Sequence, residues 1–64
     1  RRVLLVGANR NARLLIEWAK QNPHLGNRIE GVLVHEEELT GKHLEGIPIV
    51  GTMAESQKII EKMA

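Results

Sequence analysis

The residues best suited to chemistry in this chain form one short segment, Gly7-Ala8-Asn9-Arg10-Asn11-Ala12. It stands between an apolar run and a helix-periodic segment, where the G-x-G-x-x-G/A fingerprint of a dinucleotide-binding βαβ unit stands. In that fingerprint the first glycine permits a tight turn, the second lets the backbone approach a pyrophosphate, and the third small residue lets helix and strand pack closely. Free N–H groups at the helix start then hold the anion. The segment therefore predicts a phosphate-binding loop.

Two of the three fingerprint positions fit, because Gly7 and Ala12 hold the first and the third. Asn9 holds the second, where its side chain either crowds a pyrophosphate or caps the helix. Arg10 can add a cationic contact to a phosphate. We expect a nucleotide such as NAD(P), CoA or a UDP-sugar to bind here weakly at best, and a vestigial loop is the alternative.

A dinucleotide site also needs an acidic residue at the end of the second strand, where it holds a ribose hydroxyl. The corresponding residues are Val34, His35 and Glu36. Glu36 is the candidate for the ribose, and His35 can stack on a base or bond to it. The competing interpretation is an acidic surface loop, since Glu36 opens a run of three glutamates.

Other kinds of site lack the residues they need. The chain has no Cys, Tyr or Asp, and no two of its three histidines have the spacing of a helical metal pair. Ser56, the only serine, falls inside a predicted helix rather than on a strained turn. A net charge of +1 and a single tryptophan argue against nucleic-acid binding. We therefore predict no metal site, no catalytic residue and no turnover by this segment alone.

The first half of the chain predicts a strand, a helix and a second strand. Residues 3–6 are continuously apolar, as in a strand buried on both faces. Residues 9–22 have helical periodicity, with Asn9 as N-cap and Pro23 as the stop. The second strand covers 29–34. The helix should bury one face against the sheet, formed by Ala12, Leu15, Ile16 and Ala19.

The second half predicts a loop, a strand and a helix. Residues 36–46 are expected to be a loop, and residues 47–50 a strand at a sheet edge, because Pro48 cannot donate to a ladder. Thr52 and Glu55 match a capping box that opens a helix over 53–63. That helix is expected to pack through Ile59, Ile60 and Met63.

These elements predict an α/β fold, a truncated Rossmann-like parallel sheet (β-α-β-β-α, strand order 3-2-1) with helices packed on it. The strand at 3–6 would then form an unpaired apolar edge, and such edges pair with other chains. We expect self-association through that edge, through Leu14 and Trp18, or by exchange of the last helix.

The length of 64 residues fits one small domain, 1–64, and a hydrophobic content of 42% is typical of a globular chain. The apolar run at 3–6 is too short to span a membrane. A domain of this size buries only about 60% of its unfolded surface. We therefore expect it to be a fragment of a larger chain whose other part, or a neighbouring subunit, covers some of its core.

Several segments together resemble a known family. They are residues 3–7, Asn22-Pro23-His24-Leu25-Gly26, residues 28–31 and the ending with Gly46, Pro48, Gly51 and Thr52. In this order they resemble the soluble Rossmann-like, or CoA-binding-like, domain of bacterial polyprenyl-phosphate sugar-1-phosphate transferases, which start exopolysaccharide and capsule synthesis. A similar domain precedes the catalytic region of membrane-bound nucleotide-sugar dehydratases. The resemblance covers nearly the whole chain.

The resemblance implies a non-catalytic nucleotide-binding-like or assembly module of such a transferase. Two alternatives stay open: the cofactor-binding half-domain of an NAD(P)-dependent nucleotide-sugar dehydratase or epimerase, and an assembly module with a vestigial phosphate loop. The implied location is cytoplasmic, at the inner face of the bacterial membrane, with no membrane contact by this segment itself.

Overall fold

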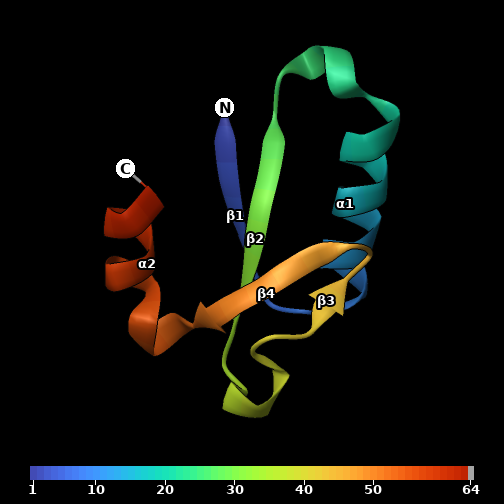
Figure 1. Ribbon diagram of the computed structural model, residues 1–64. Coiled ribbons are helices and arrows are strands. Elements are labelled where there is room, and N and C mark those ends of the chain that lie inside the picture. The colour runs from blue at the N-terminus through green and yellow to red at the C-terminus, as the bar shows by residue number, and fades with distance from the viewer. Residues whose placement is uncertain (64) are drawn as a thin grey trace.

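The computed structural model describes residues 1–63, and for Met63 it describes the backbone alone. The chain forms a small α/β domain with a mixed sheet and two helices (Figure 1). The order along the chain is β1 (Arg2–Val6), α1 (Arg10–Gln21), η1 (Pro23–Leu25), β2 (Arg28–Val34), η2 (Glu37–Leu39), β3 (His43–Leu44), β4 (Ile47–Thr52), η3 (Met53–Glu55) and α2 (Ser56–Met63).

The sheet has four strands in the order β1-β2-β4-β3. β1, β2 and β4 are parallel, and β3 runs antiparallel to β4. The prediction of a wholly parallel sheet is therefore wrong, because residues 36–46 hold η2 and a short strand rather than only a loop. The edge position of the Pro48 strand is also wrong. His43 lies opposite Pro48, and the Ile49 N–H donates to the Lys42 carbonyl at 2.8 Å.

A tight turn between β3 and β4 creates this extra strand. Glu45 has φ +50° and Gly46 has φ +83°, and positive φ at both central residues is the arrangement of a type I′ hairpin turn. Two side chains of α1 hold the turn. The Arg13 Nε donates to Glu45 Oε1 at 3.1 Å, and Lys20 Nζ donates to the Glu45 carbonyl at 2.5 Å.

The main core lies between α1 and one face of the sheet. Ala12 and Ile16 are buried there against side chains of all three parallel strands: Leu5, Val32, Val34 and Ile49. Ala19 is partly buried, but Leu15 is 46% exposed, so its predicted burial is wrong. Leu15 precedes Ile16 by one residue, or about 100° around the helix, and so faces past the sheet rather than onto it.

The opposite face of the sheet carries α2. Ile49 faces α1, and the next residue, Val50, lines a hollow with Leu4 and Ile59 of α2, so the two helices cover opposite faces. Leu33 is buried on this second face at 3% exposure. Ile60, expected to pack, is 54% exposed, whereas the packing of Met63 lies outside the described side chains. α2 therefore buries this face of the sheet only in part.

The capping box is confirmed. Thr52 and Glu55 form it, with the Glu55 carboxylate accepting from the Thr52 N–H at 3.2 Å and from its hydroxyl at 3.1 Å. The first turn after Thr52 is the 3₁₀ turn η3, and α2 continues from it. The predicted helix over 53–63 is therefore present with a tighter first turn.

Candidate functional site

The predicted phosphate loop begins at Gly7, directly after β1. Gly7 has φ +93°, a backbone conformation that residues other than glycine rarely adopt. Its N–H donates to the Leu33 carbonyl at 2.7 Å, so the last ladder bond between β1 and β2 is made as the chain leaves the sheet. The glycine is therefore needed for the strand-to-helix turn, whatever the loop binds.

Asn9 fills the place of the second fingerprint glycine and caps α1. Its backbone is extended, and its side-chain Oδ1 accepts from the Ala12 N–H at 2.9 Å. Its Nδ2 lies 3.2 Å from where a Cβ on Gly7 would stand. The carboxamide therefore folds back over the turn and satisfies a helix-start donor that an anion would otherwise use, which confirms the predicted N-cap.

The other loop residues divide between surface and interior. Arg10 and Asn11 are exposed in the first turn of α1, Ala8 is partly buried, and Ala12 is buried at 6% exposure. The first helical bond runs from the Arg13 N–H to the Asn9 carbonyl. With the Ala12 donor already bonded to Asn9, the N–H groups of Arg10 and Asn11 remain as the donors that a ligand could use.

His35 and Glu36 follow β2 and are both exposed. Val6 is the register partner of Leu33, so the residues after β1 and those after β2 lie at the same end of the sheet. This is the carboxyl end of parallel strands, where open α/β sheets bind their ligands. The structure thus brings all the predicted site residues to one end, with His35 and Glu36 one strand away from the loop.

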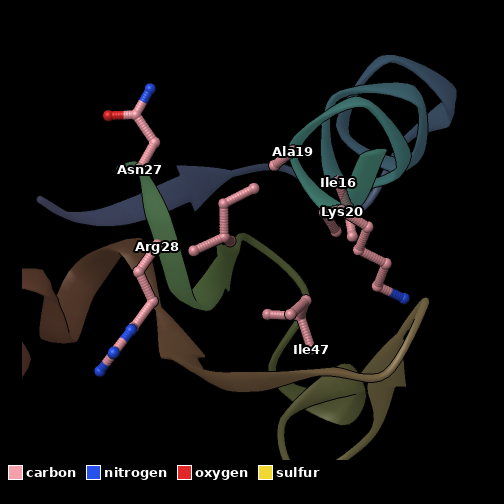
Figure 2. A pocket seen from close by; sticks show the side chains of 7 residues that line it. Ile16, Ala19, Lys20, Asn27, Arg28 and Ile47 are labelled. Carbon is pink, nitrogen blue, oxygen red and sulfur yellow. The ribbon is translucent and has the colours of Figure 1, made fainter. Parts of the chain in front are cut away.

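A hollow of about 180 Å³ lies at the opposite end, between the last turns of α1 and the starts of β2 and β4. Figure 2 shows its lining, which is mostly apolar with Lys20 and Arg28 at its rim. The two cations point in different directions, and each has a partner elsewhere. Lys20 is bonded to the Glu45 carbonyl, and Arg28 Nη1 lies 3.8 Å from Glu30 Oε1. The hollow therefore lacks polar groups that converge on a ligand.

A third feature lies along β1, the strand at the end of the sheet order. On the α1 side, Leu15 and Trp18 overhang a hollow of about 80 Å³ whose floor includes Val3, Leu5 and Ile29. Trp18 is 47% exposed. On the α2 side, Val6 is 56% exposed, and a hollow of about 330 Å³ is lined by Leu4, Val50 and Ile59 together with Glu30 and Lys62. We call the side chains of Leu4, Val6, Leu15 and Trp18 the β1 edge surface.

The two flanks of α1 explain this surface. Arg13 and Lys20 lie on the flank that faces the β3–β4 turn, to which both are bonded. With about 100° per residue, Leu15 and Trp18 fall on the other flank, toward β1. Leu14, which is 52% exposed, lies further round and points away from the sheet. Amphipathic periodicity alone did not reveal that the apolar stripe is wider than the area the sheet covers.

Comparison with family models, with curated proteins and with solved structures gave no match. The family resemblance therefore stays a prediction from the sequence.

Two further observations limit the chemistry of the described part of the chain. Residues 1–63 contain no group of three or more His, Cys, Asp or Glu side chains placed to hold a metal ion. None of the helices in this part has the length and hydropathy needed to cross a bilayer.

Proposed function

We propose that the chain is a non-catalytic α/β assembly module, which supplies a protein-binding surface along β1. The observation that carries the proposal is the β1 edge surface. It joins an edge strand of apolar residues to a half-exposed tryptophan on one face and to the exposed Val6 on the other. Tryptophan is enriched where interfaces gain most of their binding energy.

The state of the loop supports the same proposal. An anion at the start of α1 would rely on open N–H groups, and Asn9 already takes one of them. In this proposal the loop is vestigial. The domain is Rossmann-like, because β1, α1 and β2 form a parallel crossover with a glycine turn after the first strand.

The sequence resemblance supplies the wider setting of this proposal. The module would belong to a membrane-bound polyprenyl-phosphate sugar-1-phosphate transferase of polysaccharide synthesis and would lie at the cytoplasmic face. There it would hold subunits together rather than perform the transfer. A half-domain of a nucleotide-sugar dehydratase is the alternative parent, and the two parents share this role for the β1 edge surface.

Weak nucleotide binding is the second candidate function. It is favoured by the two open donors at Arg10 and Asn11 and by the position of Glu36 at the same end of the sheet. We expect any such affinity to be near 10⁻³ M, or about −4 kcal/mol.

A titration measures how strongly the loop binds nucleotides, and tight binding would replace assembly as the function of the chain. ADP, CoA, NAD and a UDP-sugar are added while the amide signals of residues 7–12 are followed by NMR. The assembly proposal expects no saturation below about 1 mM. Saturable shifts of these amides at micromolar ligand would overturn it and make the chain a nucleotide-binding module.

The variant Asn9→Gly is the matched control for that titration. It removes the carboxamide from the loop, while glycine is only a few tenths of a kcal/mol worse than asparagine as an N-cap. Tighter binding of ADP to this variant than to the wild type is expected if the Asn9 side chain is what closes the loop. Equal affinity would show that the loop is closed for another reason.

A further inference from the structure

We infer that the partner of the β1 edge surface is a second copy of this chain, with the two β1 strands paired antiparallel about a two-fold axis near Leu4. The inference rests on the proposed assembly function and names its partner. The pairing would join two four-stranded sheets into one continuous sheet.

The first argument is the hydrogen-bonding capacity of β1. The Arg1 carbonyl accepts from Arg28, and the Gly7 N–H donates to Leu33, each at 2.7 Å, so alternate residues beginning with Arg1 turn their backbone groups toward β2. Leu4 and Val6 fall on the other alternation and turn theirs toward the open edge. An antiparallel copy centred on Leu4 places outward-facing residues opposite each other, so Leu4 can exchange both bonds with its counterpart.

The second argument is that β1 has little of the protection usual for edge strands, since its one charged residue, Arg2, lies at its start. Natural edges are blunted by short length, charge, proline or a bulge. The other edge strand, β3, has only two residues and follows Lys42. β1 instead presents Val3, Leu4, Leu5 and Val6 in a row. The register between the two strands shifts at Glu30, which has no partner residue in β1. The extra residue therefore belongs to β2, and β1 is regular.

Charge favours one direction of pairing, even with Arg2 Nε placed 3.7 Å from Glu30 Oε1. Each β1 strand begins with Arg1 and Arg2. A parallel pair would place equivalent arginines about 5 Å apart across the ladder. In the antiparallel pair centred on Leu4, Arg2 lies opposite Val6 of the partner copy. The two Arg2 residues are then four positions apart along the strands. That separation is about 14 Å at 3.4 Å per residue. The antiparallel arrangement therefore avoids repulsion between like charges.

The apolar flanks fit the same symmetry. A two-fold axis perpendicular to the sheet puts both α1 helices on one face, so Trp18 and Leu15 of the two copies flank the joined strands there. On the other face Leu4 meets its counterpart beside the hollow lined by Val50 and Ile59. An interface of this kind uses the same patch on both copies, which is the commonest form of homodimer.

The test is the mass of the protein in solution measured across concentrations up to about 1 mM by analytical ultracentrifugation. We expect a concentration-dependent dimer for the wild type. Val6→Lys places a charge at the edge without removing a buried side chain, and we expect it to be monomeric. Leu25→Lys is the matched control, because Leu25 is 48% exposed in η1 and is not part of the β1 edge surface, and it should dimerise like the wild type.

Hydrogen exchange on the wild type makes the test independent of the folding of any variant. The amides of Leu4 and Val6 should exchange more slowly as protein concentration rises. A monomer at about 1 mM, or a dimer in which these two amides keep exchanging at the monomer rate, would overturn the inference. Dimerisation of Val6→Lys would do the same and would direct attention to α2. Each of these results concerns only the identity of the partner. The assembly proposal fails separately, if the nucleotide titration shows tight binding, so the two failures are distinguishable.

Discussion

The carboxamide of Asn9 shows how a single side chain selects between two roles that fit the same sequence position. The residue could crowd a ligand or cap a helix, and in the structure its Oδ1 is bonded to the Ala12 N–H. Capping is a local interaction over three residues, so it could be predicted from the sequence. The position of the amide end close to Gly7 could not, because it depends on the turn that Gly7 makes.

Gly31 is a residue whose size is dictated by its neighbours across the sheet. A Cβ at this position would stand 2.9 Å from Val50 Cγ1 and 3.4 Å from Leu4 Cδ2. We predict that Gly31→Ala lowers the free energy of unfolding by about 1–3 kcal/mol, the usual cost of overpacking. Urea denaturation of the purified variant measures this value.

The cause of that loss is checked with a second substitution. Val50→Ala removes the methyl groups that the new Cβ would meet, so the double variant should be destabilised by less than the sum of the two single changes. Strict additivity of the two effects would contradict the steric explanation.

At the level of elements, the hairpin of β3 and β4 depends on a glutamate in an unfavourable conformation. Glu45 has φ +50°, which asparagine tolerates better, while its side chain is paired with Arg13 at 3.1 Å. Glu45→Gln and Glu45→Asn both remove the ion pair, and both keep the carbonyl that Lys20 bonds. We predict that Glu45→Asn is the more stable of the two, by up to about 1 kcal/mol, in thermal denaturation. Equal stability would mean that the turn conformation costs little.

The start of the last helix should depend on pH. The backbone N–H of Thr52 and then its hydroxyl donate to the Glu55 carboxylate and hold the pKa of Glu55 below its ordinary value of 4.5, with a further contribution from Lys58. A lowered folded-state pKa gives stability that is fully present above the unfolded-state pKa and is lost as pH falls through the folded value.

We therefore predict that wild-type stability decreases on acidification below about pH 4.5 and that the loss is smaller in Glu55→Gln. Carboxyl NMR titration gives the pKa, and thermal melts across the same pH range give the stability. Parallel pH profiles for the two proteins would show that the capping box is not responsible.

At the scale of the whole molecule, the sheet is covered unevenly. α1 buries one face, whereas α2 leaves Val50 and Val6 in part exposed on the other. A chain of this size has little stability in reserve. If two copies share the β1 edge surface, dimerisation stabilises the folded state by mass action, and the thermal midpoint rises with concentration.

We predict this rise for the wild type and for Leu25→Lys, and a midpoint independent of concentration for Val6→Lys. Differential scanning calorimetry at two concentrations tenfold apart is the measurement. A constant midpoint in all three proteins would argue that no partner copy contributes to the fold.

The secondary structure of the chain follows closely from its local sequence. The apolar run before Gly7, the periodic segment between Asn9 and Pro23, and the Thr52–Glu55 capping box each specify an element through interactions a few residues apart. The pattern of residues 29–34 predicts β2 on the same basis. Such short-range terms depend little on the rest of the molecule.

The arrangement of those elements was decided by contacts between residues far apart in the chain. Arg13 and Lys20 bind a turn at Glu45 some 25 to 32 residues away, and this contact accompanies a hairpin that the sequence pattern did not predict. The same contact turns one flank of α1 toward β3 and leaves Leu15 and Trp18 over β1. Periodicity reports which residues share a helix face, but only packing against the sheet determines how much of that face is covered.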